Sequence, residues 1–252
     1  METDELLIKK RFLELAKRAE TTGRFAYTPF LGLAEQDTLH RMRAELGGIP
    51  VEQYGGAEGC ERVIVRFGSP EYFGYDEAYP ICLLLAEPVN QKFSDKLTHR
   101  DILGALMALG IERSATGDII LRENSAYIFV SERMSDYVKE NFTGAKHTVL
   151  RCRYADELPE GELFRLASAE ATVASIRLDS IVAAFLKQSR ADAQELIGKG
   201  LVFVNGRQVL SAAKTLAEDS VVSVRGSGRF IYRGELRETK KGRLAVRFDR
   251  YI

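Results

Sequence analysis

Apolar positions recur at helical spacing in the first sixty residues of this chain. They predict one helix at about Asp4–Thr21 and a second at about Leu33–Leu46. The second helix should end at Gly47-Gly48-Ile49-Pro50, because glycine supplies a left-handed cap and proline prevents continuation. The glycine-rich stretch Tyr54–Gly59 lacks the Lys-Ser/Thr pair of a phosphate-binding loop, so we interpret it as a flexible connector. Residues 1–60 are therefore expected to form a small helical N-terminal domain.

Residues 61–155 alternate between strand and helix patterns. The expected elements are strands at 62–67 and 81–89, a helix at 98–109, strands at 118–121 and 126–130, a helix at 132–141 and a strand at 148–153. From Ile81 onward the order is β-α-β-β-α-β, a ferredoxin-like arrangement that also underlies the RNA-recognition motif (RRM). Tyr127 and Phe129 share one face of the third strand. They form either a base-stacking platform or, as we favour, part of a core.

A polar stretch with Pro159 and Gly161 indicates a linker over residues 156–174. Beyond it we expect helices at 177–187 and 190–198, strands at 202–204, 207–210 and 221–225, and a last hairpin of strands 230–237 and 243–248. Ser189 is placed to cap the second helix, and Asn205-Gly206 is a strong signal for a two-residue turn. The sequence thus predicts an α+β, multi-domain chain whose last domain spans 175–252.

The formal net charge of zero conceals a division along the chain. Residues 175–252 carry 15 Lys+Arg and 8 Asp+Glu, a net of +7, out of 36 basic and 36 acidic residues in all. Residues 1–174 therefore hold 21 basic and 28 acidic residues, a net of −7. A basic unit attached to an acidic remainder is typical of a module that binds a polyanion.

The run from Ser175 to Gly226 resembles the alpha-L RNA-binding motif of the ribosomal protein S-four type. Arg177-Leu178-Asp179, Ser189-Arg190 and Val204-Asn205-Gly206-Arg207 occur in the order that the motif requires. The resemblance implies that two short helices and a hairpin present basic side chains to structured RNA. The implied contacts are Arg177, Lys187, Ser189, Arg190, Lys199 and Arg207, and the basic tail adds Arg225, Arg229, Arg233, Lys240, Lys241, Arg243 and Arg247, with Tyr232 as a stacking candidate.

Segments further upstream are similar to the YlmH family. They are residues 27–67, residues 92–118 with Lys96-Leu97-Thr98-His99-Arg100-Asp101 as the most distinctive part, and residues 223–230, where Ser227 stands in place of an expected aromatic. The resemblance implies a helical N-terminal domain, an RRM-like middle domain and the C-terminal module. It also implies action on ribosomal RNA and tRNA at the large ribosomal subunit, around blocked nascent chains, with relatives near cell-division or photosystem functions.

A non-enzymatic RNA-binding factor is the function we favour from the sequence. The alternative is an RNA-modifying enzyme, similar to a pseudouridine synthase or a methyltransferase, with catalysis in the middle domain. His99 and Arg100 are the candidates there for a functional role, His99 as a general base beside Asp101. A third interpretation, compatible with the first, is that the acidic N-terminal domains hold a protein partner.

Other classes of protein find little support in the composition. The three cysteines, Cys60, Cys82 and Cys152, form no CxxC pair, and with three histidines they give no metal-ligand spacing. We expect reduced, buried thiols, no metal and no cofactor. No apolar run approaches the ~18 residues that a membrane helix needs, and the N-terminus has no signal-peptide pattern. We therefore expect a cytoplasmic monomer that does not contact membranes.

Overall fold

The structure is a computed structural model that describes residues 2–161, 163–239 and 242–251. It divides into two compact units, residues 1–163 and 164–252. The helices are α1 Glu2–Thr22, α2 Leu33–Arg41, α3 Pro70–Phe73, α4 His99–Ala108, α5 Glu132–Asn141, α6 Leu178–Leu186 and α7 Arg190–Gly198. Short 3-10 turns occupy Arg43–Leu46, Gln91–Phe93 and Arg113–Ala115. The strands are β1 Ala26–Tyr27, β2 Val51–Tyr54, β3 Ile64–Phe67, β4 Ile81–Pro88, β5 Thr116–Arg122, β6 Ser125–Ser131, β7 Gly144–Ala145, β8 Thr148–Tyr154, β9 Leu166–Val173, β10 Val202–Val204, β11 Arg207–Gln208, β12 Val221–Val224, β13 Gly228–Glu238 and β14 Leu244–Tyr251.

The N-terminal part, which was expected to be helical, also contains a sheet. A three-stranded antiparallel sheet of order β1-β3-β2 packs against α1. The strand expected to open the middle domain, β3, pairs instead with β1 and β2. All four of its residues are buried, so it forms the centre of this small sheet rather than an approach to the next one. The apolar stripe of α1, which includes Phe12 and Leu15, packs in the same core as Phe67 of β3.

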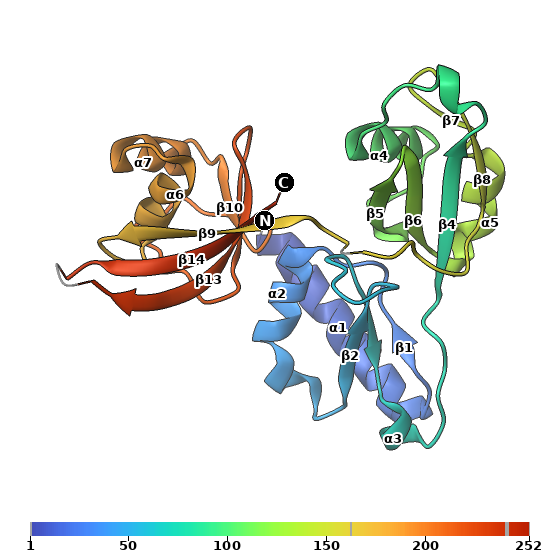
Figure 1. The fold of residues 1–252 in the computed structure, drawn as a ribbon. Coiled ribbons are helices and arrows are strands. Elements are labelled where there is room, and N and C mark those ends of the chain that lie inside the picture. The colour runs from blue at the N-terminus through green and yellow to red at the C-terminus, as the bar shows by residue number, and fades with distance from the viewer. Residues whose placement is uncertain (1, 162, 240–241, 252) are drawn as a thin grey trace. The chain divides into compact units, whose positions relative to one another are not determined.

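The middle part has the predicted ferredoxin-like topology. Its sheet has the order β5-β6-β4-β8-β7, and all of its pairings are antiparallel. Figure 1 shows α4 and α5 beside this sheet, and Ile102, Leu106 and Val138 from these helices pack with Ile128 of β6. The turn between β5 and β6 has positive φ at Glu123 and Asn124, as a two-residue hairpin requires.

One arginine joins the N-terminal sheet to the middle sheet. The Arg62 guanidinium donates to three backbone oxygens, those of Thr116 at 2.9 Å, Phe30 at 3.1 Å and Arg113 at 2.7 Å. The buried carboxylate of Asp118 accepts from the backbone N–H groups of Glu61 and Arg62 at 2.6 and 3.1 Å. Because these groups come from both sides of the boundary predicted at residue 60, the N-terminal and middle parts fold as one unit.

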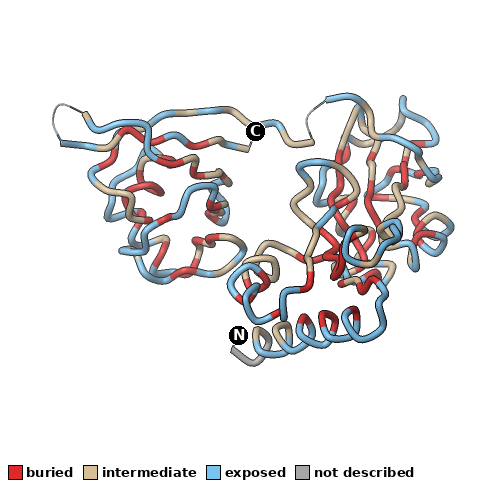
Figure 2. The backbone as a smooth tube through the Cα atoms, turned by 90° about the horizontal axis from the view of Figure 1, so that it is seen from below, coloured by how far each residue is buried: buried red, intermediate tan, exposed pale blue. Residues whose placement is uncertain are grey.

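The second unit is a six-stranded antiparallel sheet of order β11-β10-β12-β13-β14-β9, with α6 and α7 on one face (Figure 1). Its buried residues gather between this face and the helices (Figure 2), where Phe185 of α6 contacts Phe230 and Phe248. The linker predicted over 156–174 includes strand β9, which belongs to the sheet of the second unit. Residues 166–173 pair with β14 along its whole length, because Ala169, Ala171 and Val173 complete the apolar core. The α+β, multi-domain fold class is confirmed.

Candidate nucleic-acid interface

A buried carboxylate organises the surface of α6 and α7. The Asp179 side chain is fully buried at the start of α6, and its Oδ2 accepts from Arg190 at 2.7 Å, Gln194 at 2.8 Å and Arg177 at 3.2 Å. The side chains of Arg177 and Arg190 remain 41% and 48% exposed. Each guanidinium therefore uses one edge on Asp179 and keeps other N–H groups toward solvent. A guanidinium held in this way can bond phosphate oxygens with little loss of side-chain freedom.

The charge state of Asp179 follows from these contacts. Burial alone would raise the pKa of this carboxyl, but the hydrogen bonds from Gln194, Arg190 and Arg177 outweigh it and hold the pKa well below its usual range. Asp179 is therefore ionised at any physiological pH. If one partner of such a buried ion pair is removed, the other keeps its charge without a counter-charge, which destabilises the fold.

The N-terminus of α7 is not open to a phosphate, although the resemblance implied Ser189 as an RNA contact. Ser189 caps the helix as predicted, since its Oγ accepts from the Asp192 N–H at 3.1 Å. The Asp192 carboxylate in turn accepts from the Ser189 N–H at 3.0 Å and from its hydroxyl at 2.7 Å. A reciprocal capping box thus places a negative charge at the positive end of the helix. This charge opposes an incoming phosphate, and Arg190 rather than Ser189 becomes the better candidate contact.

The remaining candidates of the alpha-L motif lie at the edges of the helical face. Lys187 is exposed in the left-handed conformation that ends α6. Lys199 is exposed just after α7 and pairs with Glu195, an exposed ion pair that competes weakly with phosphate. Arg207 follows the Asn205-Gly206 turn and is half-buried, and Asn205 ties that turn to β12 through Val221. Arg250, which the motif did not single out, stacks on Phe185 at 4.5 Å near Lys187.

The opposite, helix-free face of the sheet combines aromatic rings with arginines. Phe203 on β10 lies across from Ser223 on β12, which lies across from Arg229 on β13. Alternate residues of these strands form the core, so this row faces away from the helices. The Arg225 guanidinium lies 4.8 Å from the centre of the Phe203 ring, and that of Arg229 lies 4.7 Å from the Tyr251 ring. Sequence reasoning found both arginines but missed the two rings, of which the alternation of Val202-Phe203-Val204 could have indicated Phe203.

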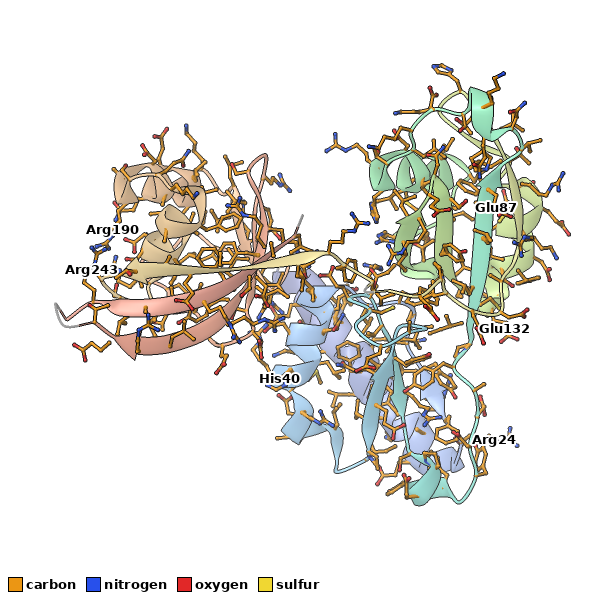
Figure 3. The ribbon with its side chains drawn as sticks, viewed as in Figure 1. Arg24, His40, Glu87, Glu132, Arg190 and Arg243 are labelled. Atoms are coloured by element: carbon orange, nitrogen blue, oxygen red, sulfur yellow. The ribbon has the colours of Figure 1, made fainter. Side chains whose placement is uncertain are left out.

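Several tail residues do not take the role expected of them. Tyr232 is buried among the core residues and cannot stack on a base. Arg233 is committed to two carboxylates, Asp249 at 2.6 Å and Asp219 at 2.7 Å. Arg243 donates to the backbone oxygen of Thr172 at 3.1 Å, and Figure 3 shows Arg190 and Arg243 on the outside of the unit. Arg247 is exposed on β14, and Lys240 and Lys241 lie outside the described residues.

The candidates in the middle domain form a structural motif. The Asp101 carboxylate accepts from the N–H and hydroxyl of Thr98 at 2.8 and 2.6 Å and pairs with Lys146 at 3.2 Å. These contacts lower the pKa of Asp101 and cap α4. The pKa of His99 is lowered by partial burial and by the Arg113 charge. The Asp101 carboxylate thus bonds the N-cap residue Thr98 rather than His99. The Arg100 side chain is exposed.

The described residues, 2–161, 163–239 and 242–251, contain no group of three or more His, Cys, Asp or Glu side chains arranged to hold a metal ion. Over the same ranges, no helix is both long and apolar enough to cross a bilayer. The three cysteines are free thiols, and each is half-buried rather than fully buried as expected.

Comparisons with known proteins find similar domains and a similar chain. Residues 76–156 match the family model described as a putative RNA-binding domain in YlmH, and residues 176–222 match the S4 domain. The chain is 29% identical over 255 residues to the ribosome-associated protein quality control protein P2 of Bacillus subtilis (strain 168), across 98% of this chain and 95% of that one. A solved structure, the cell division protein ylmH from Streptococcus pneumoniae, matches with a TM-score of 0.48 and 22% identity, over 60% of this chain and 91% of that chain. The predicted resemblance to YlmH, with a C-terminal S4 domain, is confirmed.

Proposed function

We propose that this chain is a ribosome-associated RNA-binding protein that contacts structured ribosomal RNA and tRNA on the large subunit, in translation or ribosome quality control. The observation that carries the proposal is the Arg177–Asp179–Arg190 cluster. Two guanidiniums, one from the start of α6 and one from the start of α7, are fixed on one buried carboxylate and remain about half exposed. The name of the B. subtilis relative, similar over nearly its whole length, supports the ribosome as the place where this surface works.

The mode of binding follows from the chemistry of the cluster. Arginines that contact phosphate determine position and affinity rather than base sequence. Double-stranded RNA presents phosphates and 2′-hydroxyls in a fixed geometry, so recognition depends on shape. The second unit, 164–252, has 16 basic and 9 acidic residues, a net of +7, which strengthens attraction to any such RNA. We take the protein to act as a monomer in the cytoplasm, where ribosomes are found.

Binding without catalysis is part of the proposal. The carboxylate that the sequence placed beside His99, that of Asp101, serves instead in the cap of α4 and does not support a general base at His99. The most distinctive YlmH-like segment, Lys96–Asp101, is also held by Asn124, whose amide oxygen accepts from the Leu97 N–H at 2.8 Å. These contacts support a structural role for the segment rather than an enzymatic one.

Crosslinking in the organism's own cells tests the proposal. The tagged full-length protein is irradiated with ultraviolet light, and the attached RNA is sequenced. We expect reads concentrated in large-subunit ribosomal RNA and tRNA, and a large loss of them when Arg177 and Arg190 are both replaced by Ala. The matched control is Arg133→Ala, which removes an exposed arginine from α5 in the acidic unit. Reads scattered over messenger RNA, or equal losses in both variants, would contradict the proposal.

A further inference from the structure

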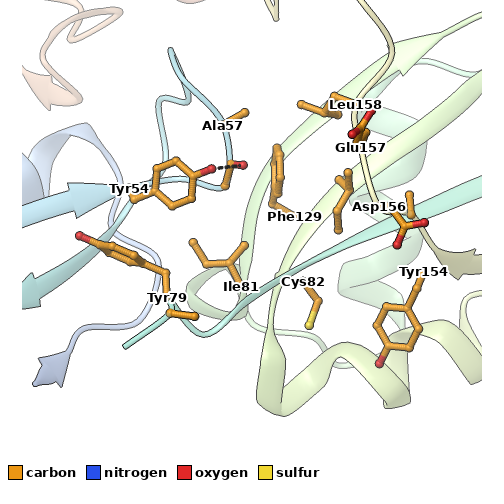
Figure 4. A pocket seen from close by; sticks show the side chains of 14 residues that line it. Tyr54, Ala57, Tyr79, Ile81, Cys82, Phe129, Tyr154, Asp156, Glu157 and Leu158 are labelled. Carbon is orange, nitrogen blue, oxygen red and sulfur yellow. Dashed lines mark hydrogen bonds between the residues drawn. The ribbon is translucent and has the colours of Figure 1, made fainter. Parts of the chain in front are cut away.

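A pocket of about 790 Å³ lies on the helix-free side of the middle sheet, within the first unit. Its walls come from the loop that follows β2, the segment that leads into β4 and the segment that follows β8 (Figure 4). The volume falls within the range of sites that hold small ligands or a few side chains. In RRM domains this side of the sheet carries the RNA-stacking aromatic residues.

The chain itself covers the ring that would serve as the stacking platform. Phe129 is only 2% exposed and packs with Phe30 and Ile64 of the N-terminal part. Gly56 lies directly on it, since a Cβ atom at Gly56 would stand 2.3 Å from the ring. Phe129 is thus the floor of the pocket, and the core interpretation of this strand face is correct for it. A base cannot stack on a ring that is already covered.

The walls of the pocket are tyrosines held in fixed orientations. The Tyr54 hydroxyl donates to the Gly56 backbone oxygen at 2.6 Å, and the Tyr54 and Tyr79 rings meet at 5.4 Å and 60°. At the other end, the Tyr154 hydroxyl donates to Asp136 at 3.0 Å. Asp156 and Glu157 line the same pocket and are exposed. Aromatic faces with neighbouring carboxylates attract a cation and repel a phosphate.

The net charge of the surrounding unit also favours a positively charged ligand. Residues 1–163 contain 20 basic and 27 acidic residues, a net of −7. Such a field disfavours a nucleotide and favours a basic ligand.

The chain also holds one of its own arginines in surroundings of this kind. The buried Arg66 guanidinium lies 4.6 Å from the centre of the Phe25 ring and 5.0 Å from that of Tyr79. It also bonds the carboxylates of Glu52 and Asp76. Tyr79 therefore contacts this internal arginine and also lines the pocket.

We propose that this pocket receives an arginine side chain from a basic segment of a protein partner, and that the YlmH-like middle domain uses its helix-free sheet face for protein rather than for RNA. Arginine suits the site better than lysine, because its planar guanidinium stacks on rings while it bonds carboxylates. The inference does not depend on RNA binding by the second unit. Its failure would leave the proposed function intact, and the converse also holds.

The test measures binding of the peptide fluorescein-(Gly-Arg)₃-Gly-amide, labelled at its N-terminus, to the full-length protein by fluorescence anisotropy. The pocket variant is D156N/E157Q, and the matched control is E140Q/E160Q, which removes two exposed carboxylates outside the pocket lining. Tyr54→Leu, at a side chain 42% exposed, tests the aromatic wall separately. Removal of residues 1–60 is a poor substitute, because β3 would lose both of its strand partners.

We expect the pocket variant and Tyr54→Leu each to weaken peptide binding about tenfold, while the control changes it little. The affinity for structured RNA should be unchanged in all three variants. Equal weakening in the pocket and control variants would show general charge attraction and overturn the proposal. So would an absence of binding to the wild-type chain, equal binding of a citrulline peptide, or competition by RNA for the peptide site.

Discussion

The guanidinium of Arg190, at the first position of α7, donates to the carboxylate of Asp179, in the first turn of α6, at 2.7 Å. This contact joins two helices through a fully buried acidic side chain and leaves the arginine about half exposed. Two partly exposed arginines of the S4 domain, Arg177 and Arg190, are therefore anchored by a fully buried carboxylate. Five predictions concern this arrangement and the contacts described in the first unit.

Arg190→Ala should reduce the salt dependence of RNA binding. If about five basic side chains meet phosphate, log affinity falls with log salt at a slope of about −3.5 to −4.5, and the variant should flatten it by nearly one unit. The measurement is filter binding or anisotropy with ribosomal RNA fragments over a range of salt concentrations. Arg133→Ala, on the acidic unit, should keep the wild-type slope. A wild-type slope near zero would rule out the phosphate contacts.

Asp179→Asn should weaken both folding and RNA binding. The loss of charged hydrogen bonds to Arg177, Arg190 and Gln194 should lower the free energy of unfolding of the second unit by about 2 kcal/mol. The substitution makes the domain more positive, so attraction by net charge alone would increase RNA affinity. We expect affinity to fall instead, because the two guanidiniums lose their common anchor. Tighter RNA binding by the variant would contradict preorganisation.

The stability difference between wild type and Asp179→Asn should depend on pH in a defined direction. Because the pKa of Asp179 is lower in the folded protein than the ~3.9 of an unfolded chain, its contribution is fully present above about pH 4. It is lost as pH falls through the folded pKa. Denaturant unfolding of both proteins should thus show a constant difference from about pH 7 to 5 and a shrinking one below about pH 4. A difference that disappears between pH 7 and 5 would refute this origin.

Gly56→Ala should destabilise the first unit by about 3 kcal/mol, from backbone strain and overlap together. Gly56 has φ +104°, and the added Cβ would meet the Phe129 ring at 2.3 Å. Gly23→Ala provides the control, since Gly23 also has positive φ but nothing lies within 4 Å of its Cβ position. It should cost only about 1–2 kcal/mol. If denaturant unfolding shows the same loss of stability in Gly56→Ala and Gly23→Ala, the loop does not press on Phe129.

His99→Ala should leave RNA affinity and cellular function unchanged, because Asp101 is engaged in the helix cap. Asp101→Ala should lower the stability of the first unit through loss of its part in the capping box, again without a change in RNA affinity. Complementation of a deletion strain and RNA binding are measured side by side. Loss of function in His99→Ala with intact affinity would favour the RNA-modifying enzyme instead.

Features that depend on residues close in sequence were predictable. The caps at Thr98 and Ser189 and the hairpin turn at Asn205-Gly206 formed as expected. Gly47 has the expected left-handed conformation, but it ends the 3-10 turn Arg43–Leu46, and the helix predicted to run to Leu46 ends at Arg41. Each rests on contacts within about four residues or on the conformational freedom of glycine and asparagine. The β-α-β-β-α-β order followed from the same local patterns. The family motif likewise identified the arginines of the S4 domain.

The sequence by itself thus determined the helices, most strands and turns, the division of charge and the residues able to meet phosphate. Only the tertiary structure decided which of these groups are committed to other partners. It paired β9 with β14, buried Asp179 beneath Arg190 and laid Gly56 on Phe129. Strands that are far apart in sequence compete with one another for hydrogen-bond partners and for a place in the core. The outcome depends on the whole chain, so it cannot be predicted from a short stretch of sequence.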